Sequence, residues 1–137
     1  MSELGDRMNL IKTTLATALP ARIFTRDMMD FAGRKNSDLQ AGIYTLVSNG
    51  ESGYQNLLSR KAMDGSQKIL LIGQIEMSED SNPSALEDAE FVMVDEIKTF
   101  LRALPPALCQ LQMTAFRQSG QIEHPRGWVA IDLEFVR

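Results

Sequence analysis

Apolar side chains at the start of the chain recur with the spacing of an α-helix. They repeat at alternating intervals of four and three residues, which stacks them on one helical face, at Leu4, Met8, Ile11, Leu15 and Ala18/Leu19. Ser2 can cap the first turn, where Glu3 and Asp6 suit the positive end of the helix dipole. Pro20 ends the pattern. Because one amphipathic helix of this length is only marginally stable alone, we expect its apolar face to pack on another element.

The next part of the chain predicts two strands separated by a polar stretch. Ala21 to Thr25 reads as a short strand, and Ile43 to Ser48 is a β-branched and aromatic run that ends at Asn49-Gly50. Asn-Gly is the strongest two-residue hairpin signal, but no clear strand follows it directly. Asp27 to Gln40 is rich in turn-forming residues, so we expect an irregular connection there.

A segment with little apolar periodicity leads to the longest predicted strand. From Glu51 to Gln67 we expect a loop or extended arm of about 17 residues, a length that in compact domains is typical of functional or disordered segments. This makes the arm the first place to look for a partner. Lys68 to Met77 then predicts a strand that is apolar on both faces. Leu70 and Ile72 lie on one face, and the other face carries Ile69, Leu71, Ile75 and Met77. Such a strand belongs in the middle of a sheet or at an interface.

A second helix follows a polar connection. Its start fits either a capping box at Ser84-Ala-Leu-Glu87 or an Asn82 cap with Pro83 at the first helical position. The buried stripe is expected at Leu86, Ala89/Glu90, Met93, Ile97, Phe100/Leu101 and Leu104. Pro105-Pro106 stops the helix. Val92 and Val94 widen its apolar surface and indicate a second contact surface.

The end of the chain predicts a β-hairpin. His124-Pro125-Arg126-Gly127 suits a type I turn, and with Glu123 opposite Trp128 the ladder sets Phe116 opposite Phe135. The second arm alternates cleanly, with apolar residues at Val129, Ile131, Leu133 and Phe135.

The first arm of this hairpin is less regular. In the same register Arg117 faces Glu134, a cross-strand pair of opposite charge. In a regular strand, Leu111 and Met113 would point to the opposite face of the sheet from Phe116. We therefore predict a β-bulge between Ala115 and Gly120, which would bring the apolar residues to one face. The whole pattern predicts one α+β domain over residues 1–137, with a mixed or antiparallel sheet of about four to five strands packed by two helices.

Composition narrows the classes of function. A net charge of −4 and a pI near 5.0 argue against nucleic-acid binding, which needs a dense basic face. The chain has no apolar run of the roughly 20 residues that a membrane span needs, and its start lacks the form of a signal peptide. We therefore expect a cytoplasmic product. Cys109 is the single cysteine, which excludes an internal disulfide, and we expect it to be buried as a small hydrophobe.

Candidate chemistry is sparse. His124 is the single histidine and has no cysteine near it that could complete a zinc site. The acidic residues around the second helix are explained by its start and by a solvated loop, at Glu76, Glu79, Asp80, Glu87, Asp88 and Glu90. No phosphate-binding glycine motif occurs, and Met28-Met29 is expected to fill the core. We expect no catalytic residue, no cofactor and no metal, and hence no enzyme.

Three stretches together carry a family resemblance. The first is the strand Ile69-Leu-Leu-Ile-Gly-Gln-Ile-Glu76 followed by a polar turn and an acidic helix start. The others are the helix end Lys98-Thr-Phe-Leu-Arg-Ala-Leu104 and the final strand Trp128-Val-Ala-Ile-Asp-Leu-Glu-Phe135. In the order of its elements, nearly the whole chain resembles the tail terminator proteins of long-tailed phages, the minor tail protein U family.

The resemblance implies a structural virion protein of the tail or neck, assembled in the host cytoplasm. Such a protein forms a ring, typically a hexamer, that binds the end of the tail tube, stops its polymerisation and offers a surface for head joining. Its implied partners are further copies of itself, the tail tube protein and a head-completion or connector protein, with no membrane and no sequence-specific nucleic acid, although DNA passes through the ring.

A closed ring needs a heterologous interface, in which one patch meets a different patch on the neighbour. The candidate patches are the arm Glu51–Gln67 and the strand Lys68–Met77. The arm offers the interface residues Tyr54, Leu57 and Leu58 as apolar anchors, with Arg60 and Lys61 as charge partners.

Other functions stay open from the sequence. A head–tail adaptor or another neck protein has the same general character, whereas a tail tube subunit would be richer in strand. A small ligand-binding or enzymatic α+β domain predicts a concave apolar pocket with convergent polar groups. A host-directed regulatory protein predicts a stable small oligomer without affinity for tail components.

Overall fold

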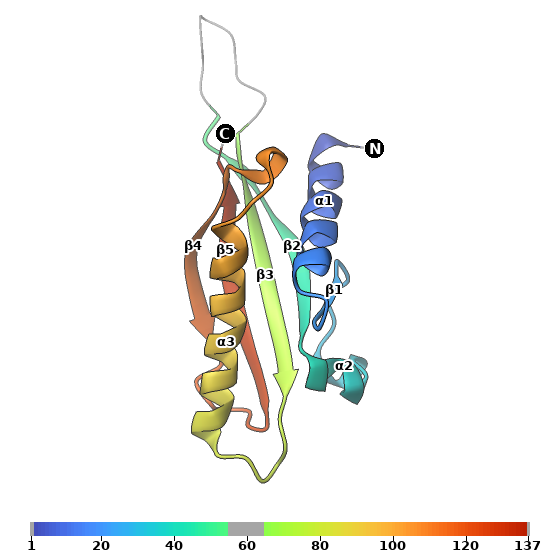
Figure 1. Cartoon of the computed structure of the whole chain (residues 1–137), viewed down its shortest axis with the longest axis vertical. Coiled ribbons are helices and arrows are strands. Elements are labelled where there is room, and N and C mark those ends of the chain that lie inside the picture. The colour runs from blue at the N-terminus through green and yellow to red at the C-terminus, as the bar shows by residue number, and fades with distance from the viewer. Residues whose placement is uncertain (1, 55–64, 137) are drawn as a thin grey trace, which may run out of the picture.

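The elements assemble into a single five-stranded mixed sheet with helices against it, which confirms the expected α+β class (Figure 1). The computed structural model describes residues 2–54 and 65–136. The elements are α1 (Glu3–Ala18), β1 (Ile23–Thr25), η1 (Phe31–Gly33), α2 (Asn36–Ala41), β2 (Ile43–Ser52), β3 (Ser66–Glu76), α3 (Pro83–Leu101), η2 (Pro106–Leu108), β4 (Leu111–Gln118) and β5 (Arg126–Phe135).

β3 is the central strand of the sheet, whose order is β1-β2-β3-β5-β4. β1 runs parallel to β2, and the other neighbouring pairs are antiparallel. Of the two places predicted for the strand apolar on both faces, the middle of a sheet or an interface, the structure has the middle of the sheet. Leu71 on its helix-covered face is fully buried, whereas Leu70 and Ile72 on its outer face are half-buried.

Both long helices lie against the same face of the sheet (Figure 1). α1 packs on β1 and β2, and α3 packs on β4 and β5. Their predicted stripes are confirmed in the main core, which includes Met8, Ile11, Leu15, Leu86, Met93, Ile97, Ile131 and Leu133. Leu4, in the first turn of α1, is exposed instead.

The helix starts show which caps the chain uses. The Ser2 hydroxyl accepts a hydrogen bond from the Gly5 amide at 3.0 Å, as predicted for α1. Of the two alternatives for α3, the structure has Asn82 at the cap and Pro83 at the first helical position. α3 ends at Leu101, so Leu104 of the predicted stripe lies beyond the helix, half-buried against the core.

The Asn49-Gly50 pair does not form a hairpin turn. β2 continues through it to Ser52, and a register shift between Ser48 and Glu51 accommodates Gly50 at a φ of 90°. A glycine with positive φ serves a bulge as well as a turn. Both ends of the predicted loop Glu51–Gln67 are therefore strand, and only its interior, residues 55–64, lies outside the described residues.

The stretch predicted to be irregular holds two short helices. η1 and α2 fall within or at the end of Asp27–Gln40. The cluster Asn36-Ser37-Asp38, interpreted as a turn, forms the first turn of α2. The same polar residue types favour turns and helix starts, because their side chains can bond to nearby backbone amides.

The hairpin exists, but its predicted register is wrong. Phe116 lies opposite Ile131 rather than Phe135, and a longer connection, residues 119–125, joins the strands where a tight turn was expected. The bulge is present between Met113 and Ala115, just before the predicted window. Arg117 consequently pairs with Asp132 at 3.5 Å, and Glu134 pairs with Lys68 at 2.7 Å.

Two predictions of burial are also wrong. Cys109 is exposed, because it follows η2 in a surface turn instead of opening a strand. Met28 and Met29 are both 47% exposed, so they do not fill the core. Both sites lie in connections between elements, where apolar character alone does not decide burial.

Candidate functional site

The predicted interface residues lie at the far end of the β2–β3 pair. These strands remain paired out to Ser52 opposite Ser66, so the chain leaves and re-enters the sheet at two adjacent points. Tyr54 is 52% exposed, and its hydroxyl donates a hydrogen bond to the Glu51 carboxylate. The other predicted interface residues are Leu57, Leu58, Arg60 and Lys61, and they lie outside the described residues.

The outer face of the sheet has a covered half and an open half. The connection from Asp27 to Arg34 covers one half, where the Arg34 guanidinium donates to the Thr45 hydroxyl at 2.9 Å and to the Gln74 side chain at 3.3 Å. The Gln74 amide in turn donates to the Met29 carbonyl at 3.1 Å. These bonds satisfy polar side chains that the covering connection buries.

The open half carries a half-buried apolar strip between ion pairs. The strip consists of Val47, Leu70 and Ile72, from β2 and β3. Lys68–Glu134 and Arg117–Asp132 lie on the same face. Apolar area framed by charges is typical of surfaces that meet a partner and yet stay in contact with water when free.

A groove of about 920 Å³ separates the two long helices on the other side of the sheet. Leu10 and Leu19 of the α1 side and Val92 and Phe100 of α3 supply much of its apolar lining, and Ala103, Pro105 and Ala107 continue it past the end of α3. Leu10 is 44% exposed and Val92 is 52% exposed. The sequence had indicated a second contact surface at Val92 and Val94. Val92 lines this groove, whereas Val94 is buried in the main core, and the structure adds the opposing wall from α1.

An ion pair at one end of this groove ties the start of β1 to α3. The Arg22 guanidinium binds both oxygens of the Glu96 carboxylate, with Nε at 3.0 Å and 3.1 Å, and also donates to the Ala41 carbonyl at 2.9 Å. The hydrogen bond to Glu96 raises the pKa of Arg22. Tyr44 donates to the Met93 carbonyl at 2.9 Å and contacts Glu96 at 3.1 Å, and burial raises the pKa of its hydroxyl.

A buried carboxylate anchors the final hairpin to α3. Glu90 is 1% exposed and accepts hydrogen bonds from the Ser119 hydroxyl, from the Gln118 amide at 3.3 Å and from the Trp128 backbone N–H at 3.1 Å. Burial raises the pKa of this carboxyl. Gly127 leaves room for this carboxylate, because a Cβ at that position would overlap it unless the Glu90 side chain shifted.

Sequence reasoning assigned Glu90 to the solvated acids, although its spacing from Leu86 and Met93 also put it in the buried stripe. That spacing was the signal that could have separated it from Glu87 and Asp88. Nothing in the local sequence singled out Arg22 or Glu96, since their pairing joins residues 74 positions apart.

The single histidine of the chain contacts a serine hydroxyl. His124 Nε2 lies 3.0 Å from the Ser81 hydroxyl oxygen, but that hydroxyl donates its proton to the Ser78 carbonyl. Among residues 2–54 and 65–136, no three histidine, cysteine or carboxylate side chains are grouped as metal ligands. In the same residues, no helix has the length and apolar character needed to cross a membrane.

Comparisons with known proteins leave the family open. No model of a known protein family matches the chain, and no curated protein sequence matches it. The geometry of its surfaces is thus what bears on its function.

Proposed function

We propose that this protein is a phage tail terminator subunit, a structural protein that forms a ring on the end of the tail tube. The ring stops tube polymerisation and presents a surface for head joining. It acts by surface matching and carries out no reaction, and it needs no cofactor.

The observation that carries this proposal is the pairing of β2 and β3 out to Ser52 and Ser66. The paired strands carry Ser52 and Ser66 to one end of the described molecule, where a neighbouring subunit or the tube can be reached (Figure 1). Apart from the added short helices, of which α2 lies between β1 and β2, the order of elements is the one on which the resemblance to the minor tail protein U family rests.

The open half of the outer sheet face supports the same proposal. Its strip of Val47, Leu70 and Ile72 gives a further apolar patch, chemically different from the ribbon end, that can meet the tube or the head. A terminator requires such a surface in addition to the two different patches by which a heterologous interface joins one subunit to the next.

The test is negative-stain electron microscopy with light scattering on concentrated full-length protein, alone and with purified tail tubes. We expect closed rings with a central hole and a mass that is a multiple of the 15.3 kDa chain, either free or on tube ends. Protein that stays monomeric and leaves tube ends bare would contradict the proposal.

A ribbon-deleted variant sharpens this test. Replacing residues 54–64 with Asn-Gly keeps the Ser52–Ser66 pair and closes the strands with a favoured two-residue turn. We expect this variant to fold with unchanged circular dichroism and to form no rings. A head–tail adaptor would also form rings but would bind the head connector in preference to tube ends, so tube binding separates the two neck proteins.

The groove between α1 and α3 favours a second candidate, a small ligand-binding domain. Its volume of about 920 Å³ lies within the range of small-molecule pockets. This candidate predicts a monomer that binds an apolar fluorescent probe such as 1-anilinonaphthalene-8-sulfonate, with loss of binding in Val92→Glu. Rings without probe binding would exclude it.

A further inference from the structure

The groove between α1 and α3 is more apolar than its composition indicates. Thr13, Thr14 and Thr17 line one wall. Their hydroxyls donate to the carbonyls of Asn9, Leu10 and Thr13, one helical turn earlier, at 2.9, 2.7 and 3.0 Å. Because these donors are satisfied within α1, the hydroxyls need no partner from an incoming ligand, and the wall can accept apolar groups.

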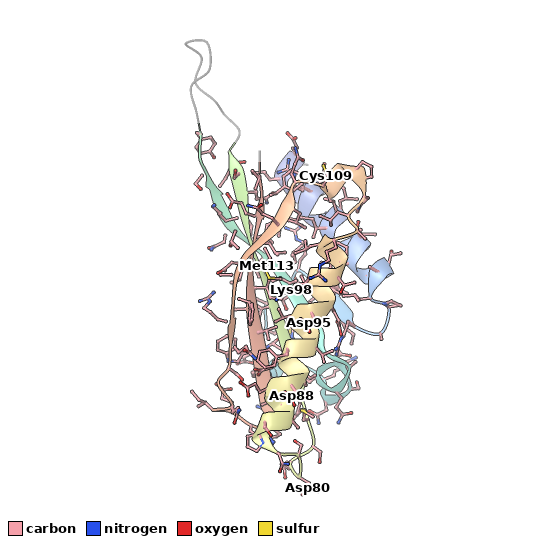
Figure 2. The ribbon with its side chains drawn as sticks, turned by 60° about the vertical axis from the view of Figure 1, so that its left-hand side comes forward. Asp80, Asp88, Asp95, Lys98, Cys109 and Met113 are labelled. Carbon is pink, nitrogen blue, oxygen red and sulfur yellow. The ribbon has the colours of Figure 1, made fainter. Side chains whose placement is uncertain are left out.

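The charge along this groove is negative. Asp95 and Glu96 are its charged lining residues, and no lysine or arginine of the described chain lines it. Glu96 is held by Arg22, whereas Asp95 is exposed on α3. Asp88 lies two turns earlier on the same helix, and Figure 2 shows both aspartates along the outward side of α3. An occupant should therefore combine apolar and basic side chains.

The chain itself contains a segment with this chemistry. Residues 54–61 read Tyr-Gln-Asn-Leu-Leu-Ser-Arg-Lys, an apolar pair followed closely by a basic pair. We infer that the α1–α3 groove binds residues 54–61 of a second copy of this chain, with Leu57 and Leu58 in the groove and Arg60 and Lys61 against Asp95 and Asp88. This inference rests on the proposed ring and names the surface that receives each ribbon.

The direction of the ribbon favours a second copy over the same chain. β2 runs toward the end of the molecule at which α1 begins and β3 runs back from it, and the two strands are still paired at Ser52 and Ser66 (Figure 1). The groove is lined from Leu10 to Leu19 and from Val92 to Phe100, and its lining continues past the end of α3 to Ala107. Because β2 leads away from the chain's own groove at Ser52, the groove of a neighbouring copy is the better-placed receiving surface.

Single substitutions test whether the groove is the receiving surface. Val92→Glu puts a charge on the exposed groove wall, where an apolar partner would have to bury it. We expect the ring association constant to fall at least tenfold, measured by sedimentation velocity, with an unchanged melting temperature. Phe91→Glu is the matched control, because Phe91 is 41% exposed on the same helix and does not line the groove. Equal effects of the two variants would overturn the inference.

Charge reversal in two separate chains tests whether the occupant comes from a second copy. One chain carries Arg60→Glu and Lys61→Glu, and the other carries Asp88→Lys and Asp95→Lys. Each alone pairs like charges and should assemble at least tenfold more weakly than the wild type. In an equimolar mixture every ribbon can find a groove of opposite charge, so we expect alternating rings to form.

The outcomes separate this inference from the proposed function. Rescue in the mixture supports docking between copies. If assembly recovers in a single chain that carries all four substitutions but not in the mixture, the segment binds the groove of its own chain, and the inference is overturned. If the variants form rings as the wild type does, the groove is not the receiving surface, but the proposed ring function still stands. A wild-type chain that never assembles, with or without tubes, would overturn both.

Discussion

The two faces of the sheet use the same strands for different purposes. On the helix-covered face, Leu71 of β3 and Ile131 of β5 are fully buried beneath α1 and α3. On the outer face, Leu70 and Ile72 of the same β3 strand remain half-buried between ion pairs. Since neighbouring residues of a strand point to opposite faces, one continuous apolar run supplies both a core and a surface. The comparison teaches that apolar character in β3 has two separate roles.

The largest expected effect comes from breaking the helix-covered face. Leu133→Asp would bury a carboxylate at a site that is 2% exposed, at a cost above about 4 kcal/mol, which is comparable with the whole stability of a small domain. We expect the variant to be unfolded by circular dichroism. Ile72→Asp, on the outer face, is the control and should cost about 1 kcal/mol in urea unfolding. A folded Leu133→Asp variant would show that β5 does not face the core as described.

The next effect concerns the carboxylate that joins α3 to the hairpin. Glu90→Leu leaves the Ser119 hydroxyl and the Trp128 amide without their acceptor, so we expect a loss of about 2–3 kcal/mol in the free energy of unfolding. Hydrogen exchange should show the largest loss of protection at residues 118–128. A loss spread evenly over the whole sheet would indicate that Glu90 is not a local anchor.

The same carboxylate gives the fold a dependence on pH. Burial raises the folded-state pKa of Glu90, so the folded protein binds the proton more tightly than the unfolded chain does. The stability from this group is fully present below the unfolded pKa, near 4.3. It is lost as the pH rises through the folded pKa. We therefore expect the wild type to lose stability relative to Glu90→Gln between pH 4 and pH 8, measured by urea unfolding. A constant difference would contradict this.

The ion pair beside the helices should matter more than those on the outer face. Arg22→Met removes the partner of Glu96, which is mostly shielded from water beside Tyr44, and we expect a loss of about 2 kcal/mol. The double variant Arg22→Met/Glu96→Met removes the unpaired charge as well and should recover part of this loss. If the double variant is as unstable as the sum of the single ones, the pair is not coupled.

The smallest effect is expected from the outer face. Arg117→Ala breaks the pair with Asp132, in which the arginine side chain is 62% exposed, and should cost less than about 1 kcal/mol. The measurement is urea unfolding at low and high salt, since screening weakens exposed pairs. A loss as large as that of Arg22→Met would remove the contrast between the two faces.

Local pattern predicted those parts of the fold in which one periodicity dominates. The stripes of α1 and α3 and the alternation of β5 were all readable, because burial of one face imposes a fixed spacing. The register of β4 against β5 was not readable. After the bulge, in Ala115–Gln118, the shift is four residues and keeps each side chain on its face, so the alternation there fits both registers.

Some of the candidate surfaces were likewise predictable from the sequence, and others were not. Tyr54 and the residues after it were identified from the sequence, as was the apolar excess at Val92. The α1–α3 groove was not, because its two walls come from helices far apart in the chain and the groove exists only once both lie on the sheet. The Arg22–Glu96 pair escaped prediction for the same reason.

The sequence by itself determined the two long helices with their buried stripes, the alternation of β5, and the apolar character of both faces of β3. These properties follow from interactions between residues close in the chain or from the repeat of a single element. The tertiary structure alone decided the hairpin register, the burial of Glu90 and the groove. Each of these depends on contacts between distant elements, where several local patterns are equally compatible with the chain and packing selects one of them.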